Sequence, residues 1–485
     1  MPTLDWIGKE AVVHHHQQVP FHLLKEDTQR QVGDPAAENM LIQGDNLLAL
    51  KALLPHYAGQ VKCVYIDPPY NTGNEGWAYN DNVNSPEIRR WLGETVGKEA
   101  EDLSRHDKWL CMMYPRIALL HELLAEDGSF WMSIDDNEVQ NARMLLDDVF
   151  GKRNFIVQAV WRSRVSPAND ATYFSSGHEY ILVYAKNGAA CRLNRLPRNE
   201  DQLDNYSNPD NDRRGAWNSV TYTCNKSVEE RPNLYYGIEN PHTGETVFPS
   251  KTAVWKFNEA TNVNHLAEDR IYWGADGDAK PRLKQFLVDM DGVVPRSVFH
   301  YDDYGHTQEA KLELNDILPE ADFKTVKPTR LIERILQIAT DPGDLVLDSF
   351  AGTGTTGHAV LQKNQKDGFD RRFILVEMEE EVAQEVTHQR LQRAVEGYEY
   401  EGTEKEVLME EKIGVRELKK GNEIYARSEE IKSEREDDFD QISRSMDDGV
   451  FTLTGKTKIT ERKDGLGSGF RYLTLGPAIR TTETA

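Results

Sequence analysis

The stretch "DLVLDSFAGTGTTGHAVLQ", residues 344–362, predicts a buried strand, a glycine-rich turn and a helix in direct succession. Gly352 and Gly354 lack a Cβ, which lets a ligand approach the backbone where the helix begins. The following apolar run, "RRFILVEME" (371–379), ends in Glu377, a carboxylate suited to ribose hydroxyls. Taken alone, this pattern fits a dinucleotide site equally well, so it indicates a nucleotide-like ligand without choosing one.

A second motif follows another predicted strand, "CVYID" (63–67), which is apolar, rich in β-branched residues and stopped by prolines. The tip after this strand reads Asp67-Pro68-Pro69-Tyr70. A plain structural interpretation is a turn in which Asp67 caps the next segment. Because strands and helices alternate along the chain, we predict an α/β fold with a doubly wound, mostly parallel, Rossmann-like sheet.

Composition sets the limits for function. The chain has 485 residues, of which 39% are hydrophobic, and a net charge of -24, which argues against a protein that coats nucleic acid non-specifically. Four widely spaced cysteines and the lack of a long apolar stretch favour a cytoplasmic protein with no membrane span. The three histidines at 14–16 point in different directions on a regular backbone, and we expect no metal site.

The character of the chain changes twice. Residues 187–322 are rich in Asn, Pro, Arg, Gly and aromatic residues and read as an insertion that recognises a ligand, or as an ordinary irregular surface domain. Residues 400–485 begin with a highly charged stretch with sparse apolar positions. This stretch predicts a charged helical hairpin or short coiled coil, with a solvated tail as the alternative.

The two motifs considered together resemble the paired marks of S-adenosylmethionine-dependent amino-methyltransferases. Because Asp-Pro-Pro-Tyr precedes Phe-x-Gly-x-Gly, the chain resembles the β-class DNA adenine-N6 methyltransferases, especially the modification subunits of type III restriction-modification systems. The resemblance is nearly chain-wide and weakest in the central insertion. Its blocks include "LIQGDNLLALKALL" (41–54), "HEYILVYAK" (178–186), "KTVKPTRLIERIL" (324–336) and "DGLGSGFRYLTLG" (464–476).

The resemblance implies a division of the chain and a set of partners. Residues 1–186 and 323–399 would form the catalytic-motif and cofactor-motif parts of the methyltransferase domain, and 187–322 the target-recognition insertion. Residues 400–485 would make dimer or partner contacts. The implied partners are double-stranded DNA, a second copy of the chain and a separate restriction subunit.

Chemistry gives the Asp-Pro-Pro-Tyr tip a task. An exocyclic amine is a poor nucleophile because its lone pair is delocalised, so it needs acceptors that orient it for methyl transfer. Asp67 and the carbonyl of Pro68 are suited to accept its two N–H groups, Pro69 stiffens the turn, and Tyr70 offers a ring to a base flipped out of the duplex.

By the same resemblance, the cofactor would be S-adenosylmethionine, held by residues from four blocks. Asp348 would lie near its amino group, Glu377 at the ribose, and Asp45 at the adenine amine. Lys327 would pack against the cofactor, or would be a surface cation. The full predicted cofactor set is Asp45, Lys327, Asp348, Phe350, Gly352, Gly354 and Glu377.

For DNA, we expect Asn71 beside the target base and Arg282 and Lys284 on the duplex. Three other functions compete with adenine methylation. N4-cytosine methylation uses the same hydrogen-bond logic, but many cytosine enzymes have Ser where this chain has Asp67. A DNA-binding specificity subunit with decayed activity would not keep both motifs intact. A nucleotide-linked dehydrogenase would leave the Asp-Pro-Pro-Tyr tip without a task.

Overall fold

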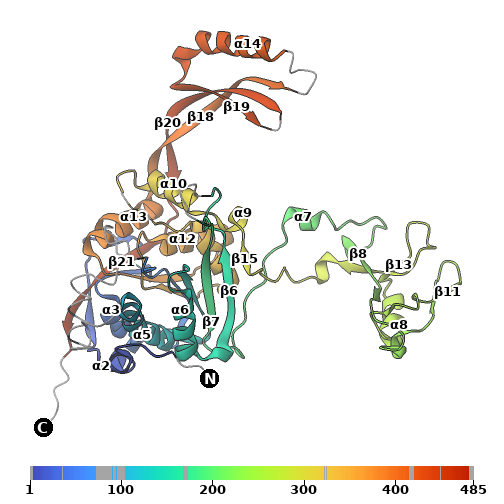
Figure 1. Ribbon diagram of the computed structural model, residues 1–485, viewed down its shortest axis with the longest axis horizontal. Coiled ribbons are helices and arrows are strands. Elements are labelled where there is room, and N and C mark those ends of the chain that lie inside the picture. Colours follow the sequence, from blue (N-terminus) through green and yellow to red (C-terminus); the bar gives the residue numbers. More distant parts are fainter. Residues whose placement is uncertain are drawn as a thin grey trace. The chain divides into compact units, whose positions relative to one another are not determined.

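A computed structural model of the chain describes residues 4–34, 36–72, 90, 94, 104–167, 173–321, 323, 325–413, 420–447 and 449–479 (Figure 1). The chain divides into two compact units. Met1–Asn194 and Arg296–Ala485 belong to the first unit, and Arg195–Pro295 form the second. The chain therefore leaves the first unit once and returns to it.

Within the described residues, the first unit is built around an 11-stranded sheet whose central strands run parallel. All four residues of β16 are buried, as expected for a strand that is covered on both faces. Antiparallel pairing occurs toward the edges, where β7 joins β5 to β6 and where β21 pairs with β1 and β2. The strands are β1 (His22–Glu26), β2 (Val32–Gly33), β3 (Met40–Gln43), β4 (Val61–Ile66), β5 (Leu124–Ile134), β6 (Phe155–Trp161), β7 (Glu179–Ala185), β15 (Val298–Phe299), β16 (Leu345–Asp348), β17 (Arg372–Glu377) and β21 (Gly469–Ala478).

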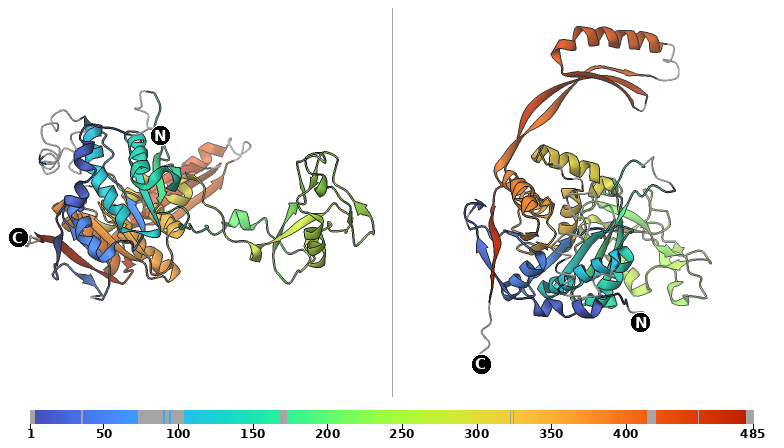
Figure 2. Two further views of the ribbon diagram at one scale, coloured as in Figure 1. Left: turned by 90° about the horizontal axis from the view of Figure 1, so that it is seen from below. Right: turned by 60° about the vertical axis from the view of Figure 1, so that its left-hand side comes forward.

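Helices pack on both faces of this sheet (Figure 2). On one face α5 lies against α3 and α6, and on the other α12 lies against α11 and α13. Leu345 and Leu347 of β16 share a core with apolar residues of α3 and α5, while the intervening Val346 is buried outside that core. The helices are α1 (Lys9–Val12), α2 (His15–Gln18), α3 (Asn46–Tyr57), α5 (Arg105–Leu123), α6 (Val139–Leu146), α9 (Tyr301–Tyr304), α10 (Thr307–Ile317), α11 (Thr329–Ala339), α12 (Thr355–Asp367) and α13 (Gln389–Glu396).

The predicted doubly wound, mostly parallel sheet is confirmed. β3, β17, β16, β4 and β5 are adjacent and parallel, so their carboxyl ends lie along one edge of the sheet. Ligands of open α/β sheets bind at this edge. Both sequence motifs follow strands of this group, and β4 and β16 are direct neighbours.

The second unit is shorter than the predicted insertion, 187–322, because the chain after 295 already belongs to the first unit. β15 pairs with β6 in the main sheet, and buried residues of α10 form a core cluster with Tyr398. Short strands surround a separate aromatic core that includes Tyr222, Trp255 and Trp273. The elements of the second unit are α7 (Glu200–Leu203), β8 (Trp217–Thr221), β9 (Thr223–Cys224), β10 (Ile238–Glu239), β11 (Thr246–Val247), β12 (Val254–Trp255), α8 (Glu259–Ala267), β13 (Ile271–Tyr272) and β14 (Arg282–Phe286).

The predicted helical hairpin after residue 400 is wrong. The described residues instead form a three-stranded antiparallel sheet and a single helix, α14 (Gly421–Glu434), which lies along that sheet (Figure 2). An exposed ribbon buries few side chains, so its sequence is charged and its apolar positions are sparse, as in a solvated helix. The strands are β18 (Gly397–Lys412), β19 (Gln441–Asp447) and β20 (Val450–Asp464).

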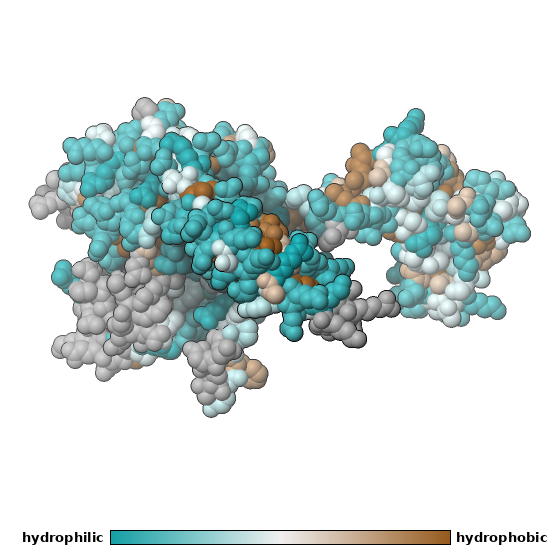
Figure 3. All heavy atoms as spheres, turned by 90° about the horizontal axis from the view of Figure 1, so that it is seen from above, coloured by the Kyte–Doolittle hydropathy of each residue, from teal (hydrophilic) through white to brown (hydrophobic). Residues whose placement is uncertain are grey.

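The visible surface of the described residues is mainly hydrophilic (Figure 3), in keeping with the high net charge. Among these residues, none of the helices combines the length and the apolar character that crossing a bilayer requires.

Candidate active site

The Asp-Pro-Pro-Tyr tip directly follows β4 at the carboxyl edge of the sheet. The two prolines lack N–H groups and restrict the backbone, so the turn is stiff. Trp109, a fully buried residue of α5, donates its indole N–H to the carbonyl of Pro69 at 2.7 Å. The tip is therefore anchored to the helix layer behind it.

Lys327 lies against this tip. Its ammonium is 2.8 Å from Asp67 Oδ2 and 3.4 Å from Glu179 Oε2, and it lies 4.8 Å from the centre of the Tyr70 ring. The Tyr70 hydroxyl donates to the same Glu179 oxygen at 2.8 Å. Four side chains from three separate parts of the chain thus form one polar cluster.

Burial shapes the ionisation of this cluster. It raises the pKa of Asp67 above the ordinary value, while the neighbouring Lys327 ammonium opposes the rise. For Lys327, burial acts to lower the pKa, but the carboxylates of Asp67 and Glu179 outweigh burial and raise it. Burial and the same two carboxylates raise the pKa of Tyr70, so Tyr70 stays a neutral donor.

The glycine-rich turn lies beside the tip, between β16 and α12. Gly352 and Gly354 have φ angles of 51° and 75°, a left-handed backbone that glycine adopts without strain. Asp348 stabilises the turn because it accepts hydrogen bonds from the Phe350 N–H at 3.0 Å and the Thr356 hydroxyl at 2.5 Å. Burial raises the pKa of Asp348 to about 7, against the effect of these bonds.

Glu377, at the end of β17, is 3% exposed and connects two backbone segments. One of its carboxylate oxygens accepts the Gly352 N–H at 2.8 Å, and the other accepts the Glu379 N–H at 3.0 Å. A carboxylate has about four acceptor positions, so these bonds orient Glu377 without exhausting its capacity for a ligand.

A cavity of about 590 Å³ joins the two motifs, within the range of small-molecule sites. Two buried side-chain oxygens on its walls, Asp67 Oδ1 and Ser349 Oγ, have no hydrogen-bond partner among the described residues. Such atoms suit a polar ligand, and the carboxylates beside Phe350 fit an adenosine bearing a cationic amino acid. The predicted residues on its walls are Asp67, Pro68, Pro69, Tyr70, Lys327, Asp348, Phe350, Gly352 and Glu377.

Three predicted residues lie off the walls of this cavity. Gly354 caps α12 with its backbone, and Asp45 caps α3 by accepting the Leu48 N–H at 3.1 Å. Asn46, which sequence reasoning missed, lines the cavity in place of Asp45.

Asn71, the third of these residues, is only 1% exposed. Its amide donates to Glu138 Oε1 at 2.5 Å and to the Arg105 carbonyl at 3.1 Å. These contacts hold Asn71 directly after the tip.

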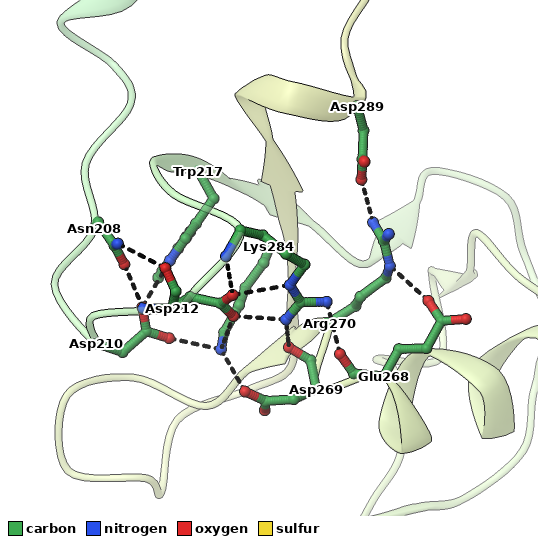
Figure 4. A network of polar contacts seen from close by, with 10 residues as sticks. Asn208, Asp210, Asp212, Trp217, Glu268, Asp269, Arg270, Lys284 and Asp289 are labelled. Atoms are coloured by element: carbon green, nitrogen blue, oxygen red, sulfur yellow. Dashed lines mark hydrogen bonds and ion pairs between the residues drawn. The ribbon is translucent and has the colours of Figure 1, made fainter.

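The two predicted DNA contacts of the insertion are engaged within the second unit, and Figure 4 shows the network around Lys284. The guanidinium of Arg282 donates to the hydroxyl oxygen of Ser219 at 2.5 Å and to the carbonyl oxygen of Ser219 at 2.7 Å. Lys284 is 4% exposed, and its ammonium lies 2.6 Å from Asp210 and 2.9 Å from Asp269. This burial argues against Lys284 as a phosphate contact.

Comparison with known proteins identifies the family. A family described as "DNA methylase" (N6_N4_Mtase) matches residues 61–388, which include both motifs and, except for Asn46, the residues that line the cavity between them. The chain belongs to this DNA methylase family.

Proteins similar to this chain include modification (Mod) subunits of restriction-modification enzymes. The Mod subunit of the type III restriction-modification enzyme StyLTI from Salmonella typhimurium is 32% identical over 77% of this chain and 57% of that protein. The EcoPI Mod subunit of Escherichia phage P1 and the EcoP15I Mod subunit of Escherichia coli are 31% and 30% identical, each over 78% of this chain and 64% of that protein. The chain thus spans about three fifths of the length of these curated relatives.

Sequence reasoning named Asp67 and Lys327 but missed Glu179 and the contact between these three charged residues. The contact between Lys327 and Asp67 joins residues 260 positions apart, and Glu179 begins a strand in a third block. The available signal was that each of the three blocks carries a charged residue next to apolar residues or proline. That signal does not indicate that the three charged residues lie in contact.

Proposed function

We propose that this chain is a site-specific DNA methyltransferase that transfers a methyl group from S-adenosylmethionine to the N6 amine of a flipped-out adenine in duplex DNA. The observation that carries the proposal is the single cavity shared by the Asp-Pro-Pro-Tyr tip and the glycine-rich turn. Membership of the DNA methylase family supports the reaction class, and the Mod-subunit relatives support a place in a restriction-modification system.

The walls of the cavity divide into a cofactor side and a base side. On the cofactor side, Asp348 would hold the amino group, Glu377 the ribose hydroxyls, and Phe350 the adenine face. When bound there, S-adenosylmethionine supplies an electrophilic methyl group on a sulfonium. Gly352, which has no side chain, leaves the backbone open on this side of the cavity.

On the base side, Asp67 would accept one N–H of the target amine and the Pro68 carbonyl the other. These contacts favour rehybridisation of the nitrogen, whose lone pair then forms the new N–C bond as the carbon–sulfur bond breaks and its electrons remain on sulfur. The nitrogen must lose one proton, and Asp67 is suited to accept this proton and release it to water. Tyr70 would stack on the flipped base.

Exposed aromatic side chains near the cavity support a nucleic-acid substrate. Tyr173 and Phe174 are 91% and 95% exposed, and the adjoining Ser175 and Ser176 line the cavity. Aromatic rings of this kind stack on unpaired bases. A separate restriction subunit belongs to the proposal, because the relatives are named as Mod subunits of restriction-modification enzymes, and we propose a homodimer as well.

The second candidate is N4-cytosine methylation, because its exocyclic amine presents the same two N–H groups. The Asp at position 67 favours adenine over cytosine. The same experiment separates the two substrates.

Purified protein is incubated with tritiated S-adenosylmethionine and mixed-sequence duplex DNA, which is then digested to nucleosides. We expect label in N6-methyladenine, and a loss of at least about 100-fold in Asp67→Asn, which keeps the side-chain shape but removes the charge and basicity. Asp127→Asn is the matched control, because Asp127 pairs with Lys62 at 2.5 Å and does not line the cavity.

The outcomes are distinct. Label in N4-methylcytosine would replace adenine methylation with N4-cytosine methylation as the function. Absence of label from every base, with cofactor and DNA both bound, would overturn it.

A further inference from the structure

Three charged groups meet at the Asp-Pro-Pro-Tyr tip. The Lys327 side chain is 8% exposed, that of Glu179 15% and that of Asp67 25%. They come from the segment before α11, the start of β7 and the end of β4. A buried ammonium between two carboxylates is costly to assemble unless its contacts are well made, so its position here requires an explanation.

The two carboxylate oxygens of Asp67 have different surroundings. Oδ2 accepts a charge-assisted hydrogen bond from Lys327 at 2.8 Å, whereas Oδ1 is buried and has no hydrogen-bond partner among the described residues. A charge-assisted hydrogen bond to one oxygen restricts the rotation of the carboxylate. The second oxygen is thereby held for a donor that enters the cavity.

Glu179 acts on both neighbours. It accepts the Tyr70 hydroxyl at 2.8 Å, which holds the ring in one orientation, and it lies 3.4 Å from the Lys327 ammonium. Glu179 therefore competes with Asp67 for the positive charge of Lys327. The polar cluster at the tip contains two carboxylates and one ammonium, so the ionisation of Asp67 depends on both Lys327 and Glu179.

We propose that Lys327 and Glu179 are positioning residues for methyl transfer: Lys327 holds Asp67 ionised with Oδ1 presented to the target amine, and Glu179 fixes Tyr70 and moderates that effect. This inference rests on the proposed function and assigns Lys327 to the base side of the cavity instead of the cofactor side. An ionised Asp67 accepts an N–H of the amine, whereas a protonated one offers a donor where an acceptor is needed.

The groups that face Asp67 predict opposite effects for the two residues. Lys327 lowers the pKa of Asp67 and Glu179 raises it, against a background of burial, which raises it most. The nearby Tyr70 hydroxyl also lowers it, and the buried Tyr65 and Asp348 interact electrostatically with Asp67 as well. Removing the lysine should therefore move the titration of Asp67 to higher pH, and neutralising Glu179 should move it to lower pH.

The first test needs neither cofactor nor DNA. The full chain is labelled with ¹³C at aspartate side-chain carboxyls, and the Asp67 resonance is assigned as the one missing from Asp67→Asn. We expect the pH midpoint of the Asp67 titration to rise by about one pH unit or more in Lys327→Met and to fall in Glu179→Gln. The midpoint of the double variant should lie between those of the two single variants. Lys327→Arg keeps the charge and should remain near the wild type, which covers the case in which Lys327→Met fails to fold.

The second test separates the base side from the cofactor side. In Lys327→Met, the dissociation constant of S-adenosylmethionine should change less than about threefold, while kcat at pH 7 falls about 100-fold and the acid limb of its pH profile shifts upward. Lys366→Met is the matched control, because Lys366 pairs with Glu333 on the surface and its side chain is 58% exposed.

An Asp67 midpoint that does not move in either variant would overturn the inference. A tenfold weaker cofactor affinity with unchanged kcat at saturation would also overturn it, because Lys327 would then be a cofactor contact. If the wild type labels no base, the proposed function fails, but the carboxyl titration still decides the inference because it requires no substrate.

Discussion

Lys327 in the first unit and Lys284 in the second are both buried lysines held by carboxylates, yet their surroundings differ. Around Lys284, Asp212 also binds Arg214 through both of its oxygens, and Asp210 accepts the Trp217 indole N–H, so the network closes on itself. Around Lys327, one oxygen of Asp67 lacks a partner among the described residues, and the cluster lines a cavity. The same ion-pair chemistry stabilises structure where it is fully satisfied and presents a reactive group where it is not.

The largest expected effect is at Lys284. Lys284→Met removes the ammonium and leaves the carboxylates of Asp210, Asp212 and Asp269 facing one another, of which Asp212 is the most buried. Breaking a buried pair costs about 3–5 kcal/mol, and the exposure of Asp269 favours the lower end, about 3 kcal/mol. Hydrogen exchange of the β8 and β14 amides in the full chain measures this loss.

A matched variant and the cofactor site make this prediction specific. Lys280→Met, at an exposed position of the same unit, should leave the exchange rates unchanged. Affinity for S-adenosylmethionine should be unaltered in both variants. If β8 and β14 keep wild-type exchange in Lys284→Met, the network does not stabilise the second unit.

The second prediction concerns Asp348, a buried carboxylate with no ion-pair partner among the described side chains. Its pKa of about 7, raised by burial, means that it is protonated below neutral pH in the free protein. A cationic ligand must displace that proton, so the dissociation constant of S-adenosylmethionine should rise up to about tenfold per pH unit below pH 7 and level off above it. Binding titrations between pH 5.5 and 8.5 test this dependence.

Asp348→Asn should weaken binding and flatten its pH dependence. A wild-type affinity that is constant across this range would show that Asp348 does not meet the positive charge. In contrast to the Lys284 network, this carboxylate would acquire its cation only from the ligand.

The smallest effect is expected for Tyr70→Phe. The substitution keeps the ring for stacking and removes only the hydroxyl that donates to Glu179, a hydrogen bond to a charged group that contributes about 1.5–3 kcal/mol to stability. We expect kcat to fall less than about tenfold, whereas Tyr70→Ala, which removes the ring, should lose considerably more. Equal losses in the two variants would mean that the hydroxyl, and not the ring, is what the tip requires.

Much of the fold was predictable because its signals are local. Gly352 and Gly354 follow an apolar strand and precede a helix, and this order alone indicates a doubly wound sheet. The convergence of Asp67, Asp348 and Glu377 follows from the same rule, since the carboxyl ends of neighbouring parallel strands meet.

Other parts depend on partners that are distant in sequence. Lys327 and Asp67 meet only because the sheet brings them together, and the acidic partners of Lys284 follow from the packing of the second unit. β18 was mistaken for helix because an exposed ribbon, such as the one that β18 forms with β20, shows little apolar alternation. Single-chain patterns report burial, and these strands bury little.

The pairing of β21 has a consequence for biosynthesis. In the described structure, β1 and β2 pair only with β21, and the His22 ring nitrogen contacts the Gly476 carbonyl 454 positions later. At about 5–20 residues per second, a ribosome needs roughly 20–90 s to synthesise the intervening chain. During that time the edge of β3 that β21 will occupy is open, so the nascent protein presents an unpaired strand edge until β21 has emerged. The order of translation thus delays completion of the main sheet until β21 has been synthesised.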